Sequence, residues 1–404
     1  MKQIYTERQQ HFVDMAAKHA DDFADRADEH DRDNTFPFEN YDEMRASGFL
    51  KLSIPEELGG LGATQSEILP AIERLAQGDA ATALAVTMHI SPLGQWSAVW
   101  ERTKMPRLEK ILREAAAGNL VWAAITSEIG TPNLMTDART TATKVDGGFV
   151  LNGRKNFGTN SSAATHCSTT ARYEDPELGP RLLLLQLDLN ADGVSIIPVW
   201  DMLGMRATQS NDIELVDVFV PDDAVVHHLP VGHLDSRVME TVFAWAQPAF
   251  GAVYNGIAAG ALEWACRQAV RRGLTNDKMV QNSIAECEIL LEQSRAALYR
   301  HADDVSSGRL KAQLTVQEAL SRCAFVKYVC TNNAVEIMNK LVEVVGGAAY
   351  VRKLPFQRLW RDCQAGLFMP FSNYASRELI GATALGVEMA PTHIAENTPP
   401  LTKI

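Results

Sequence analysis

The sequence predicts an α+β protein in which a helical segment, a β-rich segment and a second helical segment follow one another along 404 residues. Apolar residues recur every third or fourth position in "SEILPAIERLAQ" and in "TVQEALSRCAFVKYVCTNNAVEIMNKLVEVV", as on one face of a helix. Between them, "TTATKVDGGFVLNGRKNFGTN" alternates β-branched with polar residues and carries Asp-Gly and Asn-Gly turn pairs. We therefore expect an N-terminal helical domain (1–118), an antiparallel β barrel or sandwich (119–232) and a C-terminal helical bundle (233–404).

Composition excludes several classes of function. A net charge of −12 gives no basic footprint for nucleic acid. The two longest uncharged stretches, 80–100 and 241–262, both contain Pro, Gly and polar residues, so we expect buried helices and no membrane span. The six cysteines form no CxxC pair and no His/Cys cluster, which predicts no metal site and a reducing, cytoplasmic setting. The first residues lack an apolar signal core, which agrees with that location.

Four segments, in this order, resemble the acyl-CoA dehydrogenase superfamily: "FPFENYDEMRASGFLKLSIPEELGGLGAT", "LNGRKNFGTNSSAA", "LGMRATQSNDIELVDVFVPDD" and "VEVVGGAAYVRKLPFQRLWRD". The resemblance covers nearly the whole chain. It implies a three-domain fold that ends in a four-helix bundle. It also implies FAD held in the middle β domain against the bundle, a small-molecule substrate such as an acyl-CoA, and a homotetramer or homodimer. The electron acceptor stays open. No GxGxxG loop is present, which argues against a Rossmann-type site.

The resemblance also assigns residues to the flavin ring system. In "AAITSEIGTPNL", Thr126 and Ser127 correspond to the residues that hydrogen-bond the pyrimidine side of the flavin. In "NFGTN", Phe157 replaces the family's Trp over one flavin face, and Thr159 keeps the hydroxyl that the family places near flavin N5. Ser372, in the loop after the second helical segment's Arg-Asp pair, is a further cofactor candidate. Ordinary roles, as a polar loop or a core Phe, remain open alternatives.

A second group corresponds to the residues that bind the adenosine diphosphate half of FAD. Arg272 matches the Arg that pairs with the pyrophosphate across a subunit interface, and Gly346 with Gly347 would let the backbone approach it closely. Two departures weaken this half of the site. Glu343 stands in place of Gln, and 275–276 reads Thr-Asn instead of Phe-Gly, so FMN is possible. A helix-end Arg and a plain helix–helix turn are the alternative interpretations.

The expected catalytic base is missing. Dehydrogenation of an acyl thioester needs a carboxylate that takes the α-proton. Counting from Arg361, the family's usual Glu falls on Pro370, and the position used by a minority of members falls on Ala246. Neither residue accepts a proton. Glu240, six residues before Ala246, is a weak candidate because it lies on a different face of a helix.

Three hypotheses follow for the activity. The first is an FAD-dependent oxidoreductase for α,β-dehydrogenation of an acyl-CoA or acyl-like substrate, with hydride transfer to flavin N5. The second is a flavin-dependent monooxygenase of the same fold, which uses peroxyflavin chemistry and needs no α-proton base. The third is a catalytically inactive flavin-binding protein. Asn133, where the family has a residue that contacts CoA, and Phe371 are the expected substrate-side residues.

Overall fold

The N-terminal part of the computed structural model is helical, as predicted. The structure describes residues 1–130, 136–232 and 243–387, apart from the side chains of 311 and 312. The helices are α1 (Glu7–Asp33), α2 (Phe38–Ser47), α3 (Gln65–Gly78), α4 (Ala80–Thr103) and α5 (Pro106–Ala116). Side-chain caps mark the starts of two of them: Thr6 and Gln9 form a capping box for α1, and Asp79 accepts two backbone N–H groups at the start of α4.

The middle part forms one twisted sheet. Its strands are β1 (Trp122–Ala124), β2 (Thr141–Val145), β3 (Gly148–Gly158), β4 (His166–Asp175), β5 (Gly179–Asp188), β6 (Val194–Ile197), β7 (Asn211–Pro221) and β8 (Val225–Pro230). The strand order is β6-β7-β3-β2-β4-β5-β8, with β1 beside β4. The predicted antiparallel arrangement is correct for most pairs but wrong for two, because β1 and β2 both run parallel to β4. The chain runs back along β3 and crosses before β4, so β4 starts on the same side as β2.

One of the two predicted turn pairs is a turn and the other is not. Asp146 and Gly147 connect β2 to β3, and Gly147 has the positive φ of 76° that such a turn requires. Asn152 and Gly153 instead lie inside β3, where the register with β7 shifts. A Cβ at position 153 would lie 2.6 Å from Thr140 Oγ1, so this glycine permits a close approach of β3 to the residue that precedes β2.

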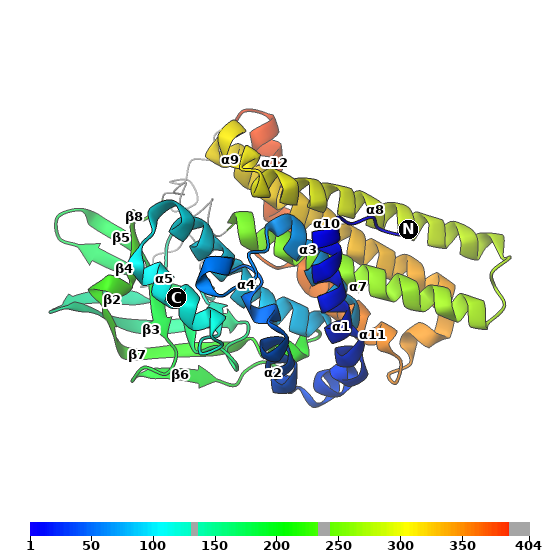
Figure 1. The fold of residues 1–404 in the computed structure, drawn as a ribbon, viewed down its shortest axis with the longest axis horizontal. Helices are drawn as coiled ribbons and strands as arrows, with labels where there is room; N and C mark the ends of the chain where they lie inside the picture. Colours follow the sequence, from blue (N-terminus) through cyan, green and yellow to red (C-terminus); the bar gives the residue numbers. More distant parts are fainter. Residues whose placement is uncertain (131–135, 233–242, 388–404) are drawn as a thin grey trace.

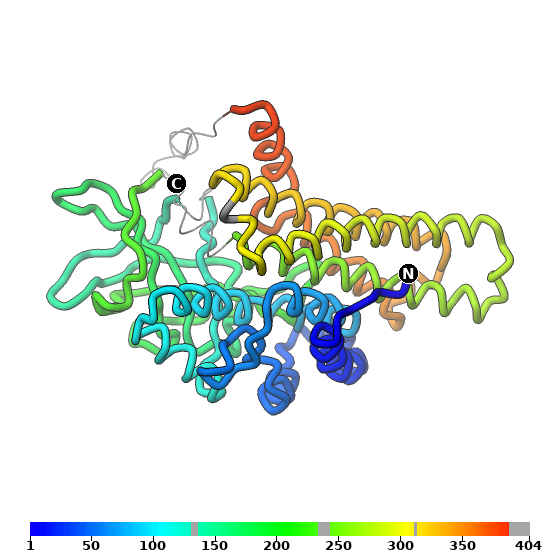
Figure 2. Tube along the Cα trace, turned by 45° about the horizontal axis from the view of Figure 1, so that its top comes forward, coloured from blue at the N-terminus to red at the C-terminus, as the bar shows by residue number. Residues whose placement is uncertain are grey.

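The C-terminal part consists of long packed helices. They are α7 (Ala244–Arg271), α8 (Lys278–Ser306), α9 (Arg309–Gln313), α10 (Val316–Val345), α11 (Pro355–Gln364) and α12 (Asn373–Ala384). α7 packs against α3, α4, α8 and α10, which explains why its first half carries no charge. In two orientations the strands occupy one end of the molecule and α7, α8 and α10 the other (Figure 1, Figure 2).

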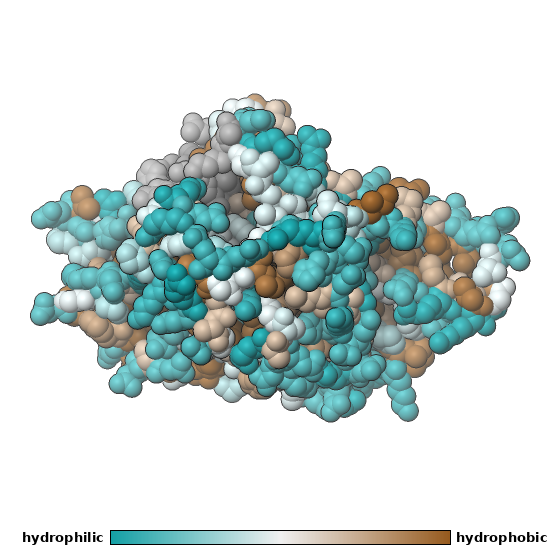
Figure 3. Space-filling view, in the orientation of Figure 1, coloured by the Kyte–Doolittle hydropathy of each residue, from teal (hydrophilic) through white to brown (hydrophobic). Residues whose placement is uncertain are grey.

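The face seen in Figure 3 is mostly hydrophilic, with apolar patches gathered over the long helices. Among the described residues, no helix is long and apolar enough to cross a bilayer. Within the same residues, no group of three or more His, Cys, Asp or Glu side chains is placed to hold a metal ion.

His89 fastens α4 to the sheet. Its Nδ1 accepts a hydrogen bond from the Trp122 backbone N–H (2.9 Å), so the ring proton is on Nε2, which donates to the Leu50 carbonyl (2.9 Å). The side chain is fully buried, and burial lowers its pKa to about 4. The ring is therefore neutral in the folded protein, and one imidazole joins a helix, a 3₁₀ turn and β1.

We expect His89 to make stability depend on pH. Between pH 6.5 and 4 the unfolded chain binds a proton at this histidine that the folded chain does not. The free energy of unfolding should therefore decrease as the pH is lowered, by about 2 kcal/mol from pH 7 to pH 5. His301, also buried with a pKa lowered to about 4 by burial, adds a similar slope. Urea unfolding measures the free energy of unfolding at pH 7 and at pH 5. The difference between these two values should be about 2 kcal/mol smaller in His89→Gln than in the wild-type chain.

The control is the wild-type chain, measured in parallel at the same two pH values. An unchanged slope in His89→Gln would contradict the assignment of a neutral, buried imidazole.

Candidate functional site

A large cavity of about 1350 Å³ lies between the sheet, α4, α7 and the loop that precedes α12. Its two main walls differ in chemistry. The wall formed by the β segments carries hydroxyl groups, among them Thr126, Ser127, Thr159, Ser168, Thr169 and Ser210. The wall formed by the helices and the loop is largely apolar, and includes Met88, Trp96, Phe243, Trp245, Phe250 and Phe371. One ligand with a polar edge and apolar faces would suit both walls.

Most residues assigned to the flavin ring system lie on this cavity. Thr126, Ser127, Phe157, Thr159 and Ser372 all line it. Ser372 has a structural role as well, because its hydroxyl accepts a hydrogen bond from the Ala375 backbone N–H and caps α12.

Phe157 lies at the mouth of the cavity in an unusual backbone conformation. Its side chain is 56% exposed and its φ is +55°, which non-glycine residues seldom adopt. The ring meets the Trp200 ring edge-on, with centroids 6.1 Å apart. This large apolar surface at the rim is therefore positioned by a neighbour and is open to a ligand.

Thr159 is connected to a chain of hydroxyl groups. Its Oγ1 lies 2.8 Å from Ser210 Oγ, which in turn lies 2.7 Å from Thr208 Oγ1. Thr208 Oγ1 donates to the Met205 carbonyl at 2.8 Å. The segment "LGMRATQSNDIELVDVFVPDD" was recognised in the sequence, but Thr208 and Ser210 within it were not singled out. Their spacing of two residues, just before β7, was the available signal.

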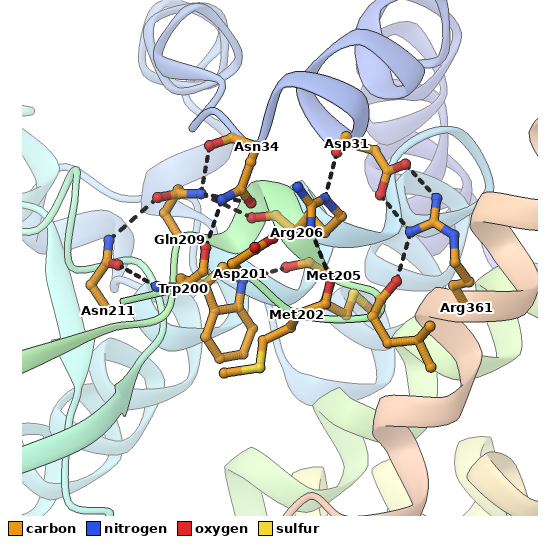
Figure 4. A network of polar contacts seen from close by, with 11 residues as sticks. Asp31, Asn34, Trp200, Asp201, Met202, Met205, Arg206, Gln209, Asn211 and Arg361 are labelled. Atoms are coloured by element: carbon orange, nitrogen blue, oxygen red, sulfur yellow. Dashed lines mark hydrogen bonds and ion pairs between the residues drawn. The ribbon is translucent and has the colours of Figure 1, made fainter. Parts of the chain in front are cut away.

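The loop of residues 198–205 leads into this hydroxyl chain and is held by hydrogen bonds and ion pairs from neighbouring elements (Figure 4). Arg361, on α11, pairs with Asp31 at the end of α1 and donates to the Leu203 carbonyl at 2.7 Å. Arg206 donates to the Asp31 carbonyl at 2.7 Å and pairs with Asp201. Because Arg361 and Asp31 belong to elements outside the sheet, both helical parts hold this cavity wall in place.

Neighbouring amides complete the same network (Figure 4). Asn34 donates to the Trp200 carbonyl at 2.6 Å, and Gln209 donates to the Asn34 carbonyl at 2.8 Å. Asn211 Oδ1 accepts the Trp200 backbone N–H at 3.1 Å, and the Trp200 indole N–H donates to the Met205 carbonyl at 3.0 Å. These bonds fix the Trp200 side chain against the cavity mouth.

A buried ion pair anchors the strip that carries Thr126 and Ser127. Lys155 Nζ lies 2.7 Å from Glu128 Oε1, and both side chains are almost completely buried. Glu128 also accepts bonds from the Thr140 hydroxyl and backbone N–H and from the Arg139 backbone N–H. Burial alone would raise the pKa of Glu128, but Lys155 and these donors lower it below its usual value. Glu128 is therefore an ionised anchor that is engaged by several donors.

The two residues predicted to stand at the family's base positions both line the cavity, and neither is an acid. Pro370 and Ala246 contribute to the lining, and Gln247 donates to the Pro370 carbonyl at 3.1 Å. The weak candidate Glu240 lies outside the described residues, as does Asn133. Apart from Glu128, the described lining has two carboxylates. Glu318 caps α10 with Thr315, and Glu378 is exposed on α12.

Lys327 supports the same loop from behind. Its Nζ donates to the Phe371 carbonyl and to Asn373 Oδ1, both at 2.9 Å, and its side chain is inaccessible to solvent. Burial lowers the pKa of this lysine to about 7. Phe371 itself stacks on Phe243, with ring centroids 4.9 Å apart and an angle of 15°. The loop is thus fixed on both of its faces.

The residues assigned to the adenosine diphosphate half lie elsewhere. Arg272 donates to the carbonyls of Val344 and Val345, both at 3.2 Å, at the end of α10. Gly346 and Gly347 follow directly after α10. None of the three lines the cavity described above. Their role in cofactor binding therefore stays a prediction.

The cavity offers unpaired polar atoms that suit a flavin. Within the described chain, Thr136 Oγ1, Thr169 Oγ1, Gln247 Oε1 and Trp96 Nε1 are buried without a hydrogen-bond partner, and all four side chains line the cavity. Each such atom costs about 1–3 kcal/mol when it stays unpaired. An isoalloxazine presents donors and acceptors along one edge between two apolar faces. The residues present therefore fit a flavin.

Comparison with known proteins agrees with the fold and the cavity. Family models match all three parts of the chain: "Acyl-CoA dehydrogenase, N-terminal domain" at residues 6–119, "middle domain" at 123–218 and "C-terminal domain" at 236–382. The chain belongs to the acyl-CoA dehydrogenase family. As in its relatives, N-terminal helices, a central sheet and a C-terminal helical part follow one another.

Individual relatives of this acyl-CoA dehydrogenase family member differ in their named activities. "Putative acyl-CoA dehydrogenase YdbM" of Bacillus subtilis is 30% identical over 378 residues, 91% of this chain and 94% of that protein. "Amino sugar nitrososynthase DnmZ" of Streptomyces peucetius is 29% identical over 375 residues, 89% of each chain. The structure of KijD3 with FMN and dTDP-3-amino-2,3,6-trideoxy-4-keto-3-methyl-D-glucose superposes with a TM-score of 0.88, at 28% identity over 97% of both chains.

Further relatives include monooxygenases and dehydrogenases. Membership therefore establishes an acyl-CoA dehydrogenase-like flavoprotein and leaves the reaction to be inferred from the site.

We expect the Glu128–Lys155 pair to make the fold sensitive to the loss of one partner. Lys155→Met leaves a buried carboxylate without its counter-ion and should lower the free energy of unfolding by about 3–5 kcal/mol. The double variant Glu128→Gln/Lys155→Met should recover a large part of that loss, because no charge stays buried. Urea unfolding followed by tryptophan fluorescence measures all three proteins.

The exposed pair Lys144–Asp222 provides the control. Lys144→Met should change the free energy of unfolding by less than about 1 kcal/mol. If Lys155→Met and Lys144→Met lowered the free energy of unfolding equally, burial of the Glu128–Lys155 pair would have no effect on stability, contrary to this prediction.

Proposed function

We propose that this protein is a flavin-dependent monooxygenase. One observation carries the proposal: the two positions that hold the family's base are Pro370 and Ala246, and both line the cavity. The carboxylates of the described lining do not replace that base, since Glu128 is held by Lys155, Glu318 is part of a capping box and Glu378 is exposed. Oxygen transfer by a flavin enzyme does not require removal of an α-proton by a carboxylate.

Residues of one wall would bind the cofactor, and residues of the other wall would bind the substrate. The hydroxyl-bearing wall with Thr126, Ser127 and Thr159 would hold the polar edge of the ring system. Bound reduced flavin supplies the electrons with which dioxygen is split, so that one oxygen atom enters the substrate and the other leaves as water. The aromatic side chains of the helical wall would hold the substrate and exclude water from the reacting atoms.

The same cavity favours an uncharged, largely apolar substrate at the reacting end. Arg361 is the one Lys or Arg in the described lining, and it is engaged by Asp31 and the Leu203 carbonyl. Trp245 packs on the backbone of α4 at Gly94, where a Cβ would collide with the indole ring. The indole therefore closes the space between α4 and α7 at this level. A compact ring system suits such a site better than an extended chain.

We propose FMN rather than FAD as the cofactor. The residues assigned to the adenosine diphosphate half lie away from the cavity, and an exposed Glu343 stands where the family has Gln. A carboxylate there is unfavourable beside a pyrophosphate. KijD3, whose structure superposes closely on this chain, was solved with FMN. A homotetramer or homodimer is retained as part of the proposal, since the family resemblance implies it.

A dehydrogenase remains the second candidate, because YdbM is named as one. In that case FAD would accept a hydride from an acyl-CoA, and a base such as Glu240 would come from outside the described residues.

Two measurements on the purified protein separate these functions. With reduced FMN and ¹⁸O₂, we expect ¹⁸O in a neutral aromatic probe such as indole, one atom for each flavin oxidised. With oxidised flavin and butyryl-CoA under anaerobic conditions, we expect no loss of flavin absorbance. Bleaching by butyryl-CoA would overturn the proposal in favour of a dehydrogenase. Flavin binding with neither reaction, over a panel of neutral aromatic probes and acyl-CoAs, would favour the inactive flavin-binding protein.

A further inference from the structure

The hydroxyl chain on the polar wall has a defined direction. It runs from Thr159 through Ser210 and Thr208 to the Met205 carbonyl, with successive oxygen–oxygen distances of 2.8, 2.7 and 2.8 Å. A carbonyl oxygen can only accept a hydrogen bond, so Thr208 donates its one hydroxyl proton to the Met205 carbonyl. Ser210 must then donate to Thr208, and Thr159 must donate to Ser210.

The consequence concerns the end of the chain that lines the cavity. Thr159 has used its proton within the protein, so its oxygen can offer only lone pairs to a ligand. The ordinary expectation for a threonine, that it either donates or accepts, does not hold here. The cavity therefore presents an acceptor at this point.

Burial and anchoring keep this direction fixed. Thr208, Ser210 and Thr159 line the cavity but are only 0%, 3% and 9% exposed, so most of each side chain is covered by the protein itself. The terminal carbonyl cannot turn away, because the Met205 backbone N–H donates to Asp362 Oδ1 at 2.5 Å and the Trp200 indole also donates to that carbonyl. The Thr208 backbone N–H donates to the same carbonyl at 3.1 Å, which keeps the Thr208 hydroxyl beside this acceptor.

We infer that Thr208 and Ser210 are positioning residues that orient Thr159 as a hydrogen-bond acceptor, so that the site prefers reduced over oxidised flavin. Oxidised flavin has an unprotonated N5, which accepts, whereas reduced flavin carries an N5–H, which donates. The family resemblance places the Thr159 hydroxyl near N5. The inference rests on the proposed flavin site, and it holds for either a monooxygenase or a dehydrogenase.

The test compares the affinities of the two redox states of one probe, FMN. Dissociation constants for oxidised and photoreduced FMN are measured under anaerobic conditions for the wild-type chain and for Ser210→Ala. Removing the Ser210 hydroxyl frees the Thr159 proton to point into the cavity. The preference for reduced FMN should fall about fivefold, and the midpoint potential of bound flavin should fall by about 20 mV for a two-electron couple.

Two further variants separate this effect from a general loss of packing. Ser210→Thr keeps a hydroxyl in the chain and should retain the wild-type ratio of affinities. Thr208→Val removes the acceptor for the Ser210 proton and should lower the ratio as Ser210→Ala does. A ratio that is the same in wild type, Ser210→Ala and Thr208→Val would overturn the inference while leaving the flavin site intact. Failure to bind either form of FMN would overturn the proposed flavin site and the inference together.

Discussion

The backbone of Met205 is the point at which the separate parts of this protein are fastened together. Its N–H donates to Asp362, a fully buried carboxylate on α11, and its carbonyl accepts from Thr208 and from the Trp200 indole. Burial raises the pKa of Asp362 to about 6. One peptide group thus connects the C-terminal helices with the polar wall of the cavity. Without it, neither the hydroxyl chain nor the position of the Trp200 side chain would be defined.

The buried charges near the cavity in the described residues are paired with one another and do not act as free acids or bases. Burying an ion is tolerated only when a partner or several donors compensate it. Glu128 and Lys155 compensate each other, and Arg361 is compensated by Asp31. The charged groups that fasten the walls are consequently unavailable for chemistry. What the described lining offers a ligand is hydroxyl groups, amides and aromatic surface, which suits a neutral ring system.

Much of the fold was predictable because it follows from local patterns of apolar and polar residues. Helical periodicity and the alternating strand segments gave the α–β–α order, and the uncharged stretch 241–262 was correctly expected to pack as a helix where it is described, from 243 onward. The parallel pairing of β1 and β2 with β4 was missed, since it depends on how the chain crosses between strands and not on composition. Asn152–Gly153 was wrongly taken for a turn, because only the neighbouring Thr140 shows why a glycine is needed inside β3.

The site was predictable in part for a similar reason. Resemblance located Thr126, Ser127, Phe157 and Thr159, which do come together on one cavity, and it located the two positions without a base. It could not show that Ser210 and Thr208 fix the proton of Thr159, because that follows from three distances between residues up to 51 positions apart. The missing base and the oriented hydroxyl chain are independent features. In the proposed function the two are combined: the polar wall would hold the cofactor while no described lining residue serves as the base, as a change of reaction on a shared scaffold requires.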